Sequence, residues 1–154
     1  MNLYEYIDAS GITLELDCEN KSDTLLALVD LLAKSKNIQN PDAILSLLEE
    51  REKLSTTGIG NAVAVPHCKS PEISDLVILI ARSNKGVDFQ ALDGKPVHLF
   101  FLLIASEQAG SLHLKALAKI ARLLKEEDVR RQFLELDSAE AVFNLIKSKE
   151  LPSN

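Results

Sequence analysis

The residues of this sequence that are best suited to chemistry are two histidines and one arginine. Residues 55–67 run from the end of a predicted helix through a glycine turn into a short strand, and they close with Pro66-His67. Ligand crevices form at strand ends in α/β sheets, and Pro66 restricts the backbone just before the ring. Because a neutral imidazole is a nucleophile that can accept a phosphoryl group, His67 is a candidate acceptor. A packed or surface histidine is the alternative.

His113 lies in the first turn of a predicted helix that begins near Ser111. Free backbone N–H groups and the helix dipole favour an anion at that position. His113 also heads an apolar stripe with Leu117 and Ile120, so its ring is predicted to face inward, toward the sheet and toward His67. A hydrogen-bonded packing histidine is the alternative here.

Arg51 lies on the apolar side of its predicted helix, close before the glycine turn. A planar guanidinium is well suited to pairing with a phosphate. The alternative is an arginine whose aliphatic stem covers the helix while its head reaches solvent. The glycine turn adds four candidates for phosphate binding through hydroxyl or backbone donors, although a GxG sequence also fits a simple turn. These candidates are Thr56, Thr57, Gly58 and Gly60.

The remaining histidine and the two cysteines suggest no second chemistry. His98 lies inside the apolar run 97–105 and is predicted to be a hydrogen-bonded core histidine. Cys18 and Cys68 lie far apart without a CxxC pair, so neither a disulfide framework nor a thiolate zinc site is expected. Neighbouring residues on an extended chain point to opposite faces, so the adjacent His67 and Cys68 do not suggest a metal site.

Charge and hydropathy exclude several classes of function. The 154 residues include 17 Lys and Arg against 23 Asp and Glu, a net charge of −6, which disfavours binding to nucleic acids and anionic membrane surfaces. Gly94-Lys95 is followed by proline, so no phosphate loop for ATP is present. The run 97–105 is too short to span a bilayer. The first residues lack the basic and apolar parts of a secretory signal, so a cytoplasmic location is expected.

The elements that must position these residues predict one α/β domain. Strands are predicted at 12–16, 62–65, 76–81 and 97–105, and the last two are apolar on both faces, so helices should cover both sides of the sheet. Other predicted features are helices after Ser22 or Asp23, after Asn40-Pro41, near Ser111, at 127–134 and at 139–147, turns at 84–86 and 93–96, and an extended stretch at 87–89. We therefore expect a single domain, 1–150, with a central mixed sheet flanked by helices on both faces, and a C-terminal tail, 151–154.

One combination of motifs is specific. Residues 51–60, REKLSTTGIG, lead into the sequence AVPH at 64–67, and His113 heads a later helix. This combination resembles the IIA domain of the fructose, mannitol and nitrogen-regulatory class of the phosphotransferase system, and the resemblance covers most of the chain. It implies that His67 accepts phosphate from a phosphohistidine carrier, either HPr or its nitrogen-branch counterpart. His113 would hold or polarise the phosphoryl group, and Arg51 would neutralise its charge. Cys68 departs from the family, in which glycine is commoner.

The resemblance implies two possible roles. A phosphoryl carrier would pass the group from His67 to a IIB partner in sugar uptake, by positioning and charge stabilisation that need no bound nucleotide, metal or other cofactor. A nitrogen-regulatory protein would instead use its phosphorylation state to control binding to transporters or kinases. The presence of Arg51, His67 and His113 together argues against a catalytically silent scaffold.

Overall fold

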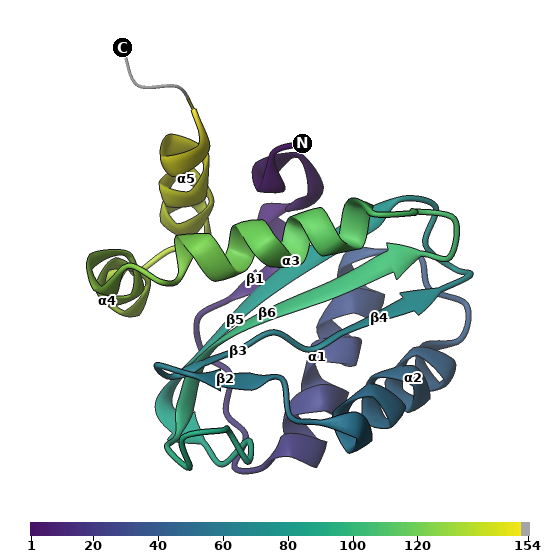
Figure 1. Cartoon of the computed structure of the whole chain (residues 1–154), viewed down its shortest axis with the longest axis horizontal. Coiled ribbons are helices and arrows are strands. Elements are labelled where there is room, and N and C mark those ends of the chain that lie inside the picture. Colours follow the sequence, from purple (N-terminus) through teal and green to yellow (C-terminus); the bar gives the residue numbers. More distant parts are fainter. Residues whose placement is uncertain (152–154) are drawn as a thin grey trace.

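The sheet at the centre of the fold is built on two long antiparallel strands, β5 (Leu76–Val87) and β6 (Val97–Ser106). The structure, a computed structural model, describes residues 1–151, and within them six strands form one mixed sheet (Figure 1). β1 (Ile12–Thr13) pairs parallel with β5. Most of β5 and nearly all of β6 are buried, as expected for strands with helices on both faces.

Three short strands extend the sheet on the other side of β6. β3 (Val63–Ala64) and β4 (His67–Ser70) both pair parallel with β6, and β2 (Gly58–Gly60) pairs antiparallel with β3. Pro66 lies between β3 and β4, where its lack of an N–H does not interrupt either ladder. His67 is therefore the first residue of a strand that the sequence did not predict.

Five helices within residues 1–151 cover the two faces of this sheet (Figure 1). α1 (Lys21–Ser35) and α2 (Pro41–Leu54) pack on one face. α3 (Leu112–Leu123), α4 (Glu127–Glu135) and α5 (Ala139–Glu150) pack on the other. The predicted architecture of one mixed sheet between two helical layers is confirmed.

Alternate side chains of the long strands divide between two hydrophobic cores, because successive residues of a strand point to opposite faces. Ile78 and Leu103 belong to the core that includes α3, α4 and α5. Leu79 and Ile104 belong to the core that includes α1 and α2. This alternation shows to which face of the sheet a side chain on a paired strand points.

The boundaries of two predicted elements need correction near the N-terminus. The strand predicted at 12–16 is only two residues long in the structure, as β1. α1 is capped by Asn20, whose side-chain oxygen accepts a hydrogen bond from the backbone N–H of Asp23 at 2.9 Å. The predicted caps, Ser22 and Asp23, instead lie in the first turn of the helix, because Asn20 already provides a good cap acceptor.

Two glycine segments that were predicted as turns belong to strands. Residues 84–86 lie within β5 and form a bulge. The pairing with β6 is irregular there, and Gly86 has a φ of +90°. Residues 58–60 form β2. The chain reverses after them, where Asn61 and Ala62 adopt φ values of 56° and 65°. Asparagine tolerates this left-handed region better than most residues.

The two ends of the described chain lie close together (Figure 1). Two short 3-10 helices, Leu3–Tyr6 and Ala9–Gly11, precede β1, and the Glu150 carboxylate accepts from the backbone N–H of Leu3 at 2.6 Å. The tail predicted at 151–154 is described only at its first residue, since 152–154 lie outside the described residues. Within residues 1–151 no helix has the length and hydrophobicity needed to cross a membrane.

The helix that carries Arg51 is held firmly at its N-terminus. The Asn40 side chain accepts from the backbone N–H of Ala43 at 3.2 Å. Glu72, in the turn that follows β4, accepts from the backbone N–H of Asn40 at 3.0 Å. These bonds satisfy backbone donors that the helix itself cannot pair, and they join α2 to the segment after β4.

We expect Asn40→Ala to lower the free energy of unfolding by about 1 kcal/mol, because α2 loses its cap acceptor. Urea denaturation followed by circular dichroism measures the change. Asn40→Ser is the matched control, since serine caps helices about as well as asparagine. Equal losses in the two variants would show that the side-chain cap is not what holds the end of α2.

Candidate functional site

The His67 ring is fixed by the backbone that precedes it. Its Nδ1 lies 2.8 Å from the carbonyl oxygen of Val65. A carbonyl oxygen only accepts hydrogen bonds, so Nδ1 carries the ring proton and Nε2 keeps its lone pair. Cys68 and its partner Ile104 face the core of α1 and α2, so His67 points to the opposite side, toward α3. The fold therefore presents Nε2 as the nucleophilic nitrogen.

Arg51, in the last turn of α2, meets this nitrogen directly. Its Nε donates a hydrogen bond to His67 Nε2 at 3.3 Å, and its Nη1 donates to the Ser55 carbonyl oxygen at 3.0 Å. Arginine can only donate, so the first contact requires the lone pair on Nε2 and agrees with a proton on Nδ1. The second bond uses a carbonyl left unpaired at the helix end and fixes the guanidinium in place.

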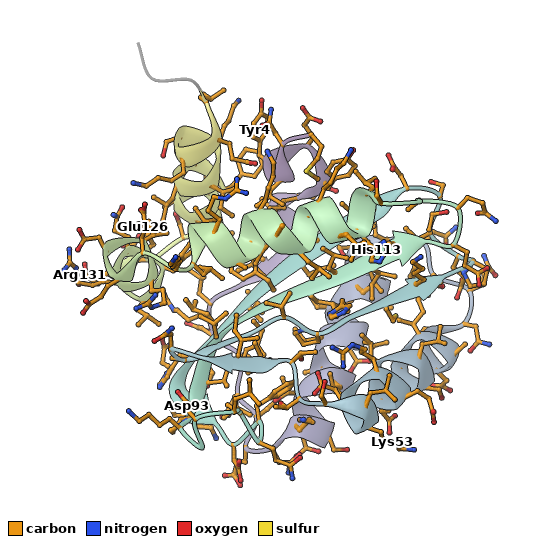
Figure 2. The ribbon with its side chains drawn as sticks, in the orientation of Figure 1. Tyr4, Lys53, Asp93, His113, Glu126 and Arg131 are labelled. Carbon is orange, nitrogen blue, oxygen red and sulfur yellow. The ribbon has the colours of Figure 1, made fainter. Side chains whose placement is uncertain are left out.

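His113 is the second residue of α3 and is half-buried. Figure 2 shows it at the end of α3 that lies over β6. Its Nδ1 lies 3.1 Å from the Gly110 carbonyl oxygen, so this ring also carries its proton on Nδ1 and leaves Nε2 free. The charge of His113 is one of the influences that lower the pKa of His67, and the expected approach of the two rings stays a prediction.

Burial lowers the pKa of His67 from its ordinary value of 6.5, and the charges of Arg51 and His113 lower it further. The hydrogen bond to Val65 and the charge of Glu52 act in the opposite direction without reversing the shift. The imidazole is therefore neutral near pH 7. A neutral ring with an unprotonated Nε2 is the form that can attack an electrophilic phosphorus.

The hydroxyls of the two predicted phosphate-binding threonines already have partners. Thr57 is 3% exposed, and its N–H and hydroxyl both donate to the carboxylate of Glu52. The Thr56 hydroxyl oxygen accepts from the backbone N–H of Gly58 at 3.1 Å and from Lys21 Nζ at 3.3 Å. The structure thus brings Arg51 to His67 but engages these threonines elsewhere, and phosphate binding by them stays a prediction.

The two predicted glycines have local roles that need no phosphate. A Cβ on Gly58 would lie 2.8 Å from the Cα of Ala91, so only glycine allows this close approach between β2 and the segment before β6. Gly60 has a φ of +97°, and a Cβ there would lie 3.5 Å from a carboxylate oxygen of Asp93. Their occurrence in the motif is explained by the local backbone, and phosphate binding by them also remains a prediction.

A buried ion pair next to Arg51 was not predicted from the sequence. Glu52 is 8% exposed, and its carboxylate lies 2.8 Å from Lys21 Nζ. A usable signal was present, because Ile44, Leu48 and Glu52 follow one another at intervals of four residues and so share the buried stripe of α2. An acidic residue on such a stripe requires a partner.

Cys68 and His98 lie outside the chemistry. Burial raises the pKa of the Cys68 thiol to about 12, so this side chain is a neutral group packed against the core of α1 and α2. His98 Nδ1 lies 2.8 Å from the Ser83 carbonyl oxygen, which confirms the predicted hydrogen bond, but the residue is only half-buried and not part of the core. No three His, Cys, Asp or Glu side chains among residues 1–151 come together as a metal site.

A pocket of about 640 Å³ opens on another side of α2. Its lining includes Lys21, Glu49, Glu52 and Lys53. The three residues from α2 share one face of the helix, and Arg51 projects from roughly the opposite face. The pocket and the pair of Arg51 and His67 are therefore separate features, and Glu52 lies between them.

The comparison with known families identifies the family to which this fold belongs. The EIIA 2 family of the phosphoenolpyruvate-dependent sugar phosphotransferase system matches residues 5–149. The chain belongs to this family.

The chain is similar both to nitrogen regulatory proteins and to fructose-specific components of the phosphotransferase system. A nitrogen regulatory protein of Bradyrhizobium diazoefficiens is 43% identical over 122 residues, 78% of this chain and 80% of that protein. A fructose-specific EIIA component of Haloferax volcanii is 36% identical over 135 residues, 88% of each chain. The fructose-specific EIIABC component of Bacillus subtilis is 33% identical over 97% of this chain, which spans only 24% of that longer protein.

Solved structures support the same fold. The nitrogen regulatory protein IIA-Ntr of Neisseria meningitidis superposes with a TM-score of 0.87 at 30% identity, over 94% of this chain and 98% of that one. Mannitol IIA of Escherichia coli, solved in complex with phosphorylated mannitol IIB, has a TM-score of 0.76 at 19% identity, over 92% of this chain and 96% of that one. The second likeness concerns the fold alone.

We expect the His67 imidazole to titrate below pH 6.5 in NMR spectra of the native protein. Because the folded pKa is lowered, the unfolded chain binds more protons once the pH falls below 6.5. The stability contributed by neutral His67 is thus fully present above pH 6.5 and is lost as the pH falls toward the folded pKa. Glutamine does not titrate, so wild type should lose more unfolding free energy than His67→Gln does as the pH falls below 6.5. A His67 pKa at or above 6.5 would show that burial does not dominate.

Proposed function

We propose that this chain is a phosphoryl carrier in which His67 Nε2 accepts a phosphoryl group from a phosphohistidine carrier protein of the HPr type and passes it to a IIB partner. The observation that carries this proposal is the hydrogen bond from Arg51 to Nε2. That bond places an unprotonated nitrogen and a permanent cation side by side, where the charge of a transferred phosphoryl group must be balanced. Membership of the EIIA 2 family supports the same chemistry.

The transfer balances without a proton moving at His67. The lone pair of Nε2 forms the new N–P bond while the N–P bond of the donor breaks and the donor nitrogen keeps the electron pair. Nδ1–H continues to donate to the Val65 carbonyl oxygen, and this oxygen stabilises the positive charge that the ring acquires. Arg51 Nε loses its acceptor when phosphorus occupies Nε2. Its N–H groups are then free to donate to the phosphoryl oxygens, for which a planar fork is well suited.

His113 would assist this step in its protonated form. With Nδ1–H bonded to Gly110, a neutral ring offers only an acceptor at Nε2, which phosphoryl oxygens would repel. Protonation would turn Nε2 into a donor to the phosphoryl oxygens. The position of His113 at the N-terminus of α3 adds the favourable end of the helix dipole.

A second candidate function is regulatory. The nitrogen regulatory protein of Bradyrhizobium is 43% identical to this chain, and IIA-Ntr of Neisseria superposes with a TM-score of 0.87. In this role the same phosphohistidine would control binding to transporters or kinases. The complex of mannitol IIA with phosphorylated IIB supports a IIB acceptor for the transport role. Neighbouring genes for IIB and IIC components would favour transport, and their absence would favour regulation.

Incubation with the phosphorylated carrier should add a single acid-labile phosphate at His67, detected by mass spectrometry under neutral and acidic conditions. His67→Ala should remain unmodified because the nucleophile is gone. His98→Ala is the matched control, since that histidine lies at the start of β6 and is bonded to Ser83. Phosphorylation of His67→Ala at the normal rate would refute the assignment.

Arg51→Ala should slow phosphoryl transfer by about 10²- to 10³-fold, the usual cost of removing one preorganised electrostatic donor. Arg51→Lys keeps the charge but not the fork, so its rate should lie between those of alanine and wild type. Arg131→Ala, on the exposed face of α4, serves as the control for loss of an arginine (Figure 2). Rates of timed phosphorylation assays that equal wild type in both Arg51 variants would remove Arg51 from the site.

A further inference from the structure

Both carboxylate oxygens of Glu52 accept hydrogen bonds from residues outside α2. One carboxylate oxygen accepts from Lys21 Nζ at 2.8 Å and from the Thr57 backbone N–H at 3.1 Å. The other oxygen accepts from the Thr57 hydroxyl. A single side chain thus joins the last turn of α2 to the start of α1 and to the segment that leads into β2.

These contacts hold the segment that anchors Arg51. The Arg51 Nη1 bond ends on the carbonyl oxygen of Ser55, which lies in the chain between Glu52 and Thr57. Tying Thr57 back to Glu52 closes this stretch into a tight loop. Any movement of the loop would move the Ser55 carbonyl and, with it, the guanidinium that donates to His67.

The charge of Glu52 is neutralised where it lies. Lys21 is 16% exposed at its side chain and Glu52 4%, so both ions are largely removed from water and depend on each other. Lys21 Nζ also donates to the Thr56 hydroxyl and lies 4.8 Å from the centre of the Phe89 ring. Lys21 therefore offsets the negative charge beside Arg51 that would repel an incoming phosphoryl anion.

We propose that Glu52 is a positioning residue for phosphoryl transfer, which acts by holding residues 55–57 so that the Arg51 guanidinium stays aligned with His67 Nε2. This inference rests on the proposed function and adds a residue to it. Glu52 does not touch the reacting atoms. Misplacement of a reacting group by about 1 Å can cost on the order of 10²-fold in rate, which is the size of effect at stake.

One variant removes the charge of Glu52 but keeps its hydrogen bonds. In Glu52→Gln the amide oxygen can still accept from Lys21 and from the Thr57 N–H, while the amide nitrogen donates to the Thr57 hydroxyl. Glu52→Ala removes all three contacts. Glu72→Ala is the matched control, because Glu72 also accepts backbone N–H bonds, but at the opposite end of α2.

The test combines transfer rates with the NMR signal of the Arg51 Nε–H, which is protected from exchange when bonded to His67. We expect Glu52→Ala to transfer about 10²-fold more slowly and to lose the protected signal. Glu52→Gln and Glu72→Ala should keep the signal and transfer within about threefold of wild type. Each variant is assayed at a temperature at which circular dichroism shows it to be folded.

Thr57→Val keeps the proposal testable if Glu52→Ala does not fold, because it deletes only the hydroxyl contact. It should weaken the protected signal of Arg51 and slow transfer. A folded Glu52→Ala, or Thr57→Val in its place, with wild-type rate and wild-type signal would overturn the role of Glu52. Equal loss of signal in Glu72→Ala would also overturn it, by showing a general effect of stability. If wild type itself takes up no phosphate, the proposed function fails, while the NMR signal still decides whether Glu52 positions Arg51.

Discussion

The hydrogen bond from Arg51 Nε to His67 Nε2 is the interaction on which the rest of the site depends. It forms only if the ring proton is on Nδ1, and the Val65 carbonyl places it there. It also requires that the last turn of α2 be held in place, which the contacts of Glu52 with its neighbours arrange. One bond thus joins the helical layer to the strand that carries His67.

Burial and charge act together on this bond. Partial burial disfavours protonation of the His67 imidazole, so its Nε2 keeps the lone pair that Arg51 contacts. Burial of Glu52 would oppose the site if its charge were unpaired, but Lys21 balances it. The permanent charge of Arg51 is therefore the one that meets His67, and a phosphoryl group is the kind of anion that this arrangement accommodates.

Elements with strong periodicity were predictable from the sequence. The runs 76–81 and 97–105 are apolar on both faces because each face packs on its own core. His67 and Arg51 were predictable because they belong to a specific motif. β2 and β4 were missed, since strands of three and four residues have too little length to show alternation. The burial of Glu52 could have been inferred from its place on the stripe of Ile44 and Leu48. Its partners could not, because Lys21 belongs to α1 and Thr57 to the segment before β2, and no local pattern shows such contacts.

The reacting nitrogen of His67 can be identified directly by ¹⁵N NMR of histidine-labelled protein before and after phosphorylation. With the bonds to Val65 and Arg51 in place, Nδ1 should be protonated and Nε2 bare in the unmodified protein at pH 7.5. After incubation with the phosphorylated carrier, coupling to phosphorus should appear at Nε2 while the Nδ1 proton remains. A proton on Nε2 in the unmodified protein, or phosphorus on Nδ1 after transfer, would contradict the mechanism.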